Sequence, residues 1–273
     1  MVLAFLCALQ PGNCTPAQSV EVSAKRKALA DVKEMAEAGD ANSQVQLGLA
    51  YLTGDGIARN DSEAAKWLRK AADQDHPLAE RYLAEMYFKG RGVPADAAEA
   101  AKLLLMAAQQ GDSQSQHNLA VMYIQAQGVP RNLNQAANWM RKSAEQGLAA
   151  AQLGMGVLCE NGQGVPEDPT EAIKWYRLAI AQGNADAMNN LALLLATSTD
   201  SGIRNPQQAI ELATRAVSLG RNPDYVATLA AAYFAAGQSD KAIEEQRKAL
   251  ALRPDDESYQ QTLQKYLAAA NGH

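Results

Sequence analysis

Histidines, cysteines and glycine triplets are the residues of this sequence that could carry chemistry. His76, His117 and His273 could bind a metal or transfer protons, but none has a second histidine four residues away or a carboxylate at metal-ligand spacing. We therefore interpret them as ordinary surface histidines, and we expect neither a metal nor another cofactor.

The three cysteines, Cys7, Cys14 and Cys159, show no Cys-x-x-Cys spacing and no metal-ligand spacing. Cys7 and Cys14 could pair with each other, which would leave Cys159 over. The cysteines therefore indicate neither a metal site nor a disulfide framework.

Gly-x-Gly triplets begin at Gly54, Gly90 and Gly162 and could suggest a phosphate-binding loop. They recur at multiples of 36 residues and follow expected helices, whereas a phosphate loop of the dinucleotide-binding type follows a strand. We therefore interpret these glycines as residues that let the chain reverse in the loop between two helices. Signatures of P-loop nucleotide binding, zinc proteolysis or a serine-hydrolase elbow are missing from the sequence.

Composition narrows the class of protein. Of 273 residues, 47% are hydrophobic and 20% charged, which is typical of globular chains. Aromatic residues are only 5%, so the core must be built from alanine and leucine, which favours closely packed helices. The net charge is −5, so the chain lacks the basic surface that is typical of nucleic-acid binding proteins. No apolar run is long enough for an integral membrane span.

The N-terminal segment can be interpreted in two ways. Val2–Leu9 is apolar, is followed by Pro11-Gly12, and has small residues at Thr15–Ala17, which resembles a secretory signal although no basic residue precedes it. The alternative is a hydrophobic segment that docks on the first helix pair. Residues 1–22 are thus expected to be a signal peptide or a disordered N-terminus, which favours a periplasmic or secreted protein over a cytoplasmic one.

An internal repeat of 36 residues is the strongest signal in the chain. Four units keep this register without a gap from Gly39 to Gly183, and a fifth follows with a one-residue slip. A half unit, 23–38, precedes them as a lone second helix. The columns that carry the register are Leu47, Leu83, Leu119 and Met155; Tyr51, Tyr87 and Tyr123, where Cys159 follows; and Gly56, Gly92, Gly128 and Gly164.

Each unit is predicted to contain two helices. In the first unit, Ala41–Thr53 forms one helix, glycines reverse the chain, and a second helix begins at Asn60. Glu63 completes a capping box with Asn60, in which each side chain satisfies a free N–H at the helix start. The same pair recurs as Asp96/Glu99, Asn132/Gln135, Asp168/Glu171 and Asn205/Gln208.

Two further columns predict how the helices pack. Small residues recur where the two helices of a unit cross, because a larger side chain would force the axes apart. A column of Trp67, Trp139 and Trp175 also holds leucines, so we interpret it as core packing and not as an aromatic binding ladder. The small-residue column consists of Gly48, Ala84, Ala120, Gly156 and Ala192.

The units, with Leu-Gly-x-x-Tyr, Gly-x-Gly-Val-Pro, Ala-x-x-Trp and Ala-Ala-x-x-Gly, resemble the Sel1-like repeat. Residues 222–254 resemble a plain tetratricopeptide (TPR) unit, and 259–270 would be a terminal capping helix with Gln260, Gln261 and Gln264 in water. The resemblance implies an all-α fold, a right-handed superhelical α-solenoid of stacked antiparallel helix pairs. The chain is expected to have four parts. The N-terminal segment 1–22, a signal peptide or a disordered region, is followed by an initiating helix in 23–38. About five Sel1-like units occupy 39–221, and a TPR unit with a capping helix occupies 222–273.

The resemblance implies a non-enzymatic scaffold that binds a protein partner, as a peptide or helix, in its concave groove. The alternative is an exported cell-envelope assembly or regulatory factor. A third interpretation, a β-lactamase-like hydrolase, is disfavoured because the regular cysteine pairs of such Sel1 members and the serine-hydrolase motifs are missing.

TPR geometry assigns the inner wall to the first helix of each pair. The columns that it turns inward mix apolar with polar side chains, which is typical of an interface, although tight curvature could instead bury some of them. Phe88 and Ile124 would be apolar anchors, and Arg81 and Asn189 would hold a backbone or a carboxylate. The predicted partner-binding residues are Arg81, Glu85, Phe88, His117, Val121, Ile124, Val157 and Asn189.

Overall fold

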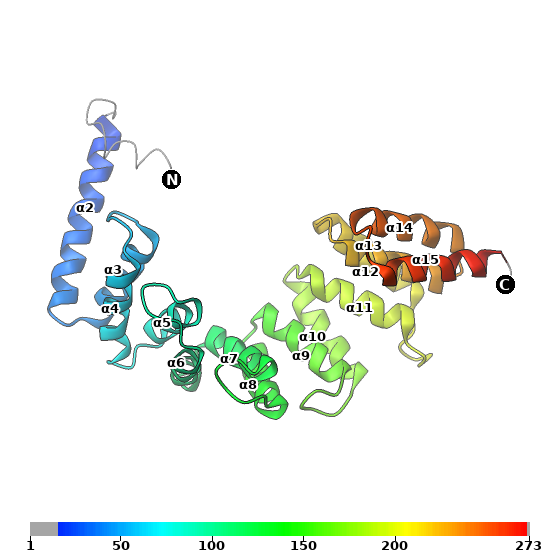
Figure 1. Cartoon of the computed structure of the whole chain (residues 1–273), viewed down its shortest axis with the longest axis horizontal. Helices are drawn as coiled ribbons and strands as arrows, with labels where there is room; N and C mark the ends of the chain where they lie inside the picture. Colours follow the sequence, from blue (N-terminus) through cyan, green and yellow to red (C-terminus); the bar gives the residue numbers. More distant parts are fainter. Residues whose placement is uncertain (1–15, 272–273) are drawn as a thin grey trace. The chain divides into compact units, whose positions relative to one another are not determined.

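The computed structural model describes residues 16–271, which form fourteen helices and no strand (Figure 1). Cys7, Cys14, His273 and most of the predicted signal segment lie outside the described residues. The helices are α2 (Pro16–Glu37), α3 (Ala41–Thr53), α4 (Asp61–Ala72), α5 (Pro77–Lys89), α6 (Ala97–Gln109), α7 (Ser113–Gln125), α8 (Leu133–Glu145), α9 (Ala149–Glu160), α10 (Pro169–Ala181), α11 (Ala185–Thr197), α12 (Pro206–Leu219), α13 (Pro223–Ala235), α14 (Ser239–Leu252) and α15 (Glu257–Ala270).

The chain divides into two compact units, residues 1–139 and 140–273, with the boundary inside α8. In each unit consecutive helices pack as pairs, such as α3 with α4 and α9 with α10. The first helix of a pair also packs on the second helix of the pair before, as α5 does on α4 and α11 on α10. The predicted all-α solenoid of stacked helix pairs is confirmed. We call α3, α5, α7, α9, α11 and α13 the first helices, and their even-numbered partners the second helices.

Helix α2 lies at the start of this array and packs against α3 as a second helix would. It begins at Pro16, earlier than the Ser23 expected from the repeat pattern.

Small residues stand where the helices of a pair cross, as predicted. Ala84, Ala120 and Ala192 are at most 1% exposed. A Cβ atom added to Gly48 would lie 2.8 Å from Cγ of Leu68, so the helices approach too closely for a side chain. Trp67 and Trp175 are buried in the core, and Cys159 is a buried free thiol.

In the second and third repeats, the second glycine of the loop has a role beyond reversing the chain. A Cβ atom at Gly92 would lie 2.1 Å from the backbone oxygen of Asp61, and one at Gly128 would lie 2.0 Å from that of Ala97. Both oxygens belong to the start of the second helix one repeat earlier. This glycine therefore lets the loop of one repeat lie directly on the preceding repeat.

The capping boxes are half confirmed. Side chains of the predicted capping residues accept hydrogen bonds from the backbone of the first helical turn, as Asn60 does from Ser62 and Glu63. The reciprocal half of the prediction is wrong, because the backbone N–H of Asn60 donates to the carbonyl of Tyr51, 2.9 Å away. The same bond, from the capping residue to the end of the first helix, recurs at Asp96, Asn132, Asp168 and Asn205.

Acidic side chains that were predicted to bond to the N–H of the capping residue form ion pairs instead. Glu63 pairs with Lys66, and Glu99 with Arg69 of the preceding repeat. Arg69 also donates to the hydroxyl of Tyr87, 2.7 Å away, so this cluster links two consecutive repeats.

A buried glutamine joins one repeat to the next. The side-chain amide of Gln152 donates to the carbonyl of Ala144, in the last turn of the preceding second helix, and accepts from Gln182 at 2.8 Å. In the first repeat, Gln44 makes the equivalent hydrogen bonds to the carbonyl of Ala36 and to the side chain of Gln74. The carbonyl of Ala144 also accepts from the backbone N–H of Gly147, so the amide of Gln152 is its second donor, and the glutamine links three helices through its two hydrogen bonds.

Glu80 replaces this glutamine in the second repeat. Its Oε2 accepts from Gln110 at 2.9 Å, but its Oε1, the atom that corresponds to the amide nitrogen, is buried without a partner. Burial, and then the nearby charge of Asp75, raises the pKa of Glu80 to about 7. The protonated acid is the form that resembles glutamine and fits this joint.

The C-terminal helices continue the packing beyond the fifth repeat. The rings of Phe234 and Tyr266 stack with centroids 4.4 Å apart, which joins α15 to α13. Arg253 pairs with Asp224, which also accepts from the hydroxyl of Tyr259. The three glutamines predicted to face water on α15 are exposed.

We predict that Gly92→Ala destabilises the protein more than Gly111→Ala does. Both glycines have positive φ, which costs an alanine about 1–2 kcal/mol. Only Gly92 also has a backbone oxygen in the way, and overpacking adds roughly 1–3 kcal/mol. Gly111 has nothing within 4 Å of an added Cβ. Equal unfolding midpoints in urea would contradict the close loop contact.

We also predict that Glu80 makes stability fall as pH rises. The folded protein binds its proton more tightly than the unfolded chain, so stability is lost from the ordinary pKa near 4.5 up to about 7. Compared with Glu80→Gln, the wild type should lose roughly 3 kcal/mol of unfolding free energy between pH 4 and pH 8. The reverse variant, Gln44→Glu, should gain a similar dependence. Parallel pH profiles for wild type and Glu80→Gln would contradict this interpretation.

Candidate functional site

The eight predicted partner-binding residues all lie on first helices. Three are on α5, three on α7, one on α9 and one on α11. None of the eight is buried: Glu85 and Phe88 are exposed, and the others are partly exposed. In this order they are Arg81, Glu85 and Phe88; His117, Val121 and Ile124; Val157; and Asn189. We call the exposed side of the first helices that carries these residues the first-helix face.

The first-helix face of unit 1 includes exposed apolar side chains. Phe88 is 44% exposed, which is unusual for a large aromatic side chain. Val121 and Ile124, on the next first helix, are partly exposed. Leu49 and Leu52, one repeat earlier, are partly buried against the core. Because these helices follow one another in the stack, unit 1 offers apolar side chains on successive first helices.

The cations of this face are already paired. The Nε atom of Arg81 lies 3.4 Å from Oδ1 of Asp112, and its guanidinium stacks over the ring of Tyr82. Lys89 pairs with Glu85 at 2.6 Å. The Nε atom of Arg81 therefore faces Asp112, which caps α7, and the predicted role of its guanidinium in holding a backbone or a carboxylate stays a prediction.

Histidines and amides supply the remaining polarity of unit 1. The Nε2 atom of His76 lies 3.2 Å from Oδ1 of Asn42, and the Nδ1 atom of His117 lies 3.3 Å from Oδ1 of Asn118. Burial lowers the pKa of His117, although its hydrogen bond to Asn118 opposes this. His117 is therefore neutral at neutral pH, and the face of unit 1 presents hydrogen-bonding groups with balanced charge.

The first-helix face of unit 2 combines the predicted residue Asn189 with Glu160, which was not among the predicted partner-binding residues. Asn189 donates to Asn190 at 3.3 Å, while its own side-chain oxygen is buried without a partner. Glu160, one turn after Val157, accepts a hydrogen bond from the hydroxyl of Tyr176. The sequence signal for this contact was Tyr176, which stands in a column that otherwise holds leucine or methionine. It follows Gly156 by 20 residues.

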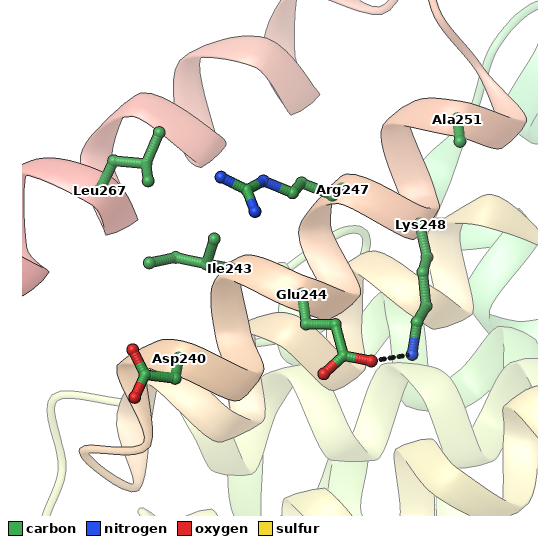
Figure 2. A pocket seen from close by; sticks show the side chains of 7 residues that line it. All are labelled: Asp240, Ile243, Glu244, Arg247, Lys248, Ala251 and Leu267. Atoms are coloured by element: carbon green, nitrogen blue, oxygen red, sulfur yellow. Dashed lines mark ion pairs between the residues drawn. The ribbon is translucent and has the colours of Figure 1, made fainter.

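A separate groove lies at the C-terminal end of unit 2, between α14 and α15 (Figure 2). Its volume is about 680 Å³, and Ile243 and Leu267 supply its apolar lining. Charged residues of α14 surround these two, including Glu244 and Lys248, which pair at 2.7 Å.

Residues 16–271 contain neither a cluster of metal-ligand side chains nor a helix that could span a membrane. No three histidine, cysteine, aspartate or glutamate side chains gather there as metal ligands would. None of the helices in this range combines the length and the hydropathy needed to cross a bilayer.

Comparison with family models finds five copies of the "Sel1 repeat" in tandem. They match residues 41–76, 77–112, 113–148, 149–184 and 185–220. These bounds agree with the period and register that we predicted for 39–221. No curated protein sequence matches the chain.

Solved structures with the same fold include a protective antigen of uropathogenic Escherichia coli, with 30% identity and a TM-score of 0.61. The match covers 90% of this chain but only 61% of that protein. A Sel1 repeat protein of Oxalobacter formigenes matches with 24% identity and a TM-score of 0.66, over 84% of this chain and 96% of its own.

The fold also resembles YrrB, described as a TPR protein with an unusual peptide-binding site. That match has 14% identity and a TM-score of 0.55, and it covers 72% of this chain and 98% of YrrB. At this identity the likeness concerns the fold.

Proposed function

Because this chain belongs to the Sel1 repeat family, we propose that it is a non-enzymatic scaffold that binds a peptide or helix of a partner protein on its first-helix face. The observation that carries the proposal is the exposure of Phe88, with Val121 and Ile124 on the next first helix. Contiguous apolar surface bordered by polar groups is a usual mark of a protein interface.

The architecture supports this choice of surface. The second helices bury wide apolar stripes of alanine, leucine and tryptophan in the core, and their other side carries charged residues such as Lys174 beside exposed apolar ones such as Leu178. The first helices lie between neighbouring second helices and keep a partly apolar side exposed. Stacked repeats offer such sides in series, which suits an extended peptide or a helix.

Charge balance in unit 1 indicates how that face would bind. Arg81 and Lys89 are paired within the protein, so a partner gains little from acidic residues there. Exposed ion pairs contribute little to affinity, and the apolar anchors would provide most of the binding energy. The proposal therefore makes Phe88 the residue whose loss costs most.

We predict that Phe88→Ala weakens binding by about 2 kcal/mol, which is roughly 30-fold. Peptides would be selected from a displayed random library with the full chain as bait, and their affinities measured by calorimetry. Leu178→Ala is the matched control, because Leu178 is a similarly exposed apolar residue, at 48%, but lies on the second helix α10.

Both variants should keep the wild-type helical content and melting temperature, since each removes a largely exposed side chain. If Leu178→Ala loses as much affinity as Phe88→Ala, the binding surface lies on the second helices. If the bait selects no peptide, the chain is not a peptide-binding scaffold.

A further inference from the structure

Unit 2 contains a hydrogen-bond network that holds a carboxylate on the first-helix face. Tyr176 of α10 has no exposed surface, and its hydroxyl donates to Oε2 of Glu160, at the end of α9, over 2.5 Å. The side chain of Asn190, on α11, lies near the same phenol. Glu160 is thus oriented by the hydroxyl of a fully buried side chain on the neighbouring helix.

Packing alone does not explain the tyrosine. The equivalent positions of the earlier repeats hold Leu68, Leu104 and Met140, which fill the core without any polar atom. Tyr176 fits only because Gly156 lies beside it, since a Cβ atom there would come within 2.4 Å of its ring. The pair of Gly156 and Tyr176 therefore brings a hydroxyl through the helix crossing to the first-helix face.

The carboxylate so held is not neutralised. Within the described part of the chain, no lysine or arginine nitrogen lies within 4 Å of Glu160. The contrast with unit 1 is clear, where Arg81 and Lys89 each have an acidic partner. A partly exposed, oriented carboxylate without a counter-charge has its strongest complement in a cationic side chain.

Nearby groups add to this preference. On α11 the side chain of Asn189 donates to Asn190, while its own oxygen is buried and does not face a ligand. Val157 lies one helical turn before Glu160 and is partly exposed, and Leu193, at the equivalent position of the next repeat, is 41% exposed. The site thus offers one carboxylate beside apolar surface.

We propose that Glu160, positioned by Tyr176, binds a lysine or arginine side chain of a partner peptide whose apolar neighbours pack on Val157 and Leu193. This inference rests on the proposed function and adds the chemistry of the ligand. Tyr176 acts as a positioning residue, because it touches Glu160 and not the ligand.

The test compares peptides selected from one displayed random library with the wild-type chain and with Glu160→Gln. The wild type should enrich peptides with a lysine or arginine between apolar residues, and Glu160→Gln should not. For one enriched peptide, Glu160→Gln should lower the affinity at least tenfold, and added salt should weaken wild-type binding because it screens the charges. Replacing the peptide's basic residue with norleucine should have the same effect as Glu160→Gln.

Two further variants separate this role from folding. Tyr176→Phe keeps the ring beside Gly156 but removes the hydroxyl, so affinity should fall several-fold while the melting temperature changes little. Glu160→Lys should restore binding to a peptide in which glutamate replaces the basic residue.

Peptides that bind wild type and Glu160→Gln equally, with no excess of lysine or arginine, would overturn the site and leave the proposed scaffold function standing. A bait that selects no peptide would overturn both.

Discussion

The joint between repeats is the constraint on which the rest of this structure depends. At this joint the carbonyl of Ala144, in the last turn of a second helix, accepts from the backbone N–H of Gly147, and the side-chain amide of Gln152 on the next first helix gives it a second donor. The same amide accepts from a glutamine at the end of its own pair, so one residue fixes the distances among three helices. The small residues at the helix crossings and the glycines under the loops work within the spacing that this joint sets.

That spacing also decides which surface is left for binding. Packing uses the apolar stripes of the second helices and one side of the first helices, and it leaves the first-helix face in contact with water. The two units then differ in what they place there. Unit 1 has Phe88 beside cations that are paired within the protein, whereas unit 2 has Glu160 with no cation beside it. Two surfaces of the same architecture thus favour different features of a ligand.

Sequence alone predicted what depends on period and residue size. It identified the repeat, the helix pairs, the capping side chains and the crossing column of Gly48 and Gly156. It failed where a contact depends on backbone position. The N–H of Asn60 bonds to Tyr51 and not to the side chain of Glu63, because the loop brings that carbonyl within reach. For the same reason, the contact of Gly92 with Asp61 could not be inferred from a turn signature alone. The site residues fall on the predicted helices, but the pairing of Arg81 with Asp112 required coordinates.

The repeat also shows how departures from its own pattern can be interpreted. A column that serves only packing tolerates another apolar residue, even one of different size, as Trp67 and Leu103 show. A polar atom in such a column must find a partner or cost stability. Glu80 has a partner for one oxygen only and responds by binding a proton more tightly. Tyr176 finds its partner outside the core, on the first-helix face, and so converts a packing position into support for a surface carboxylate. The first departure acts on stability, and the second acts on the surface that a ligand would meet.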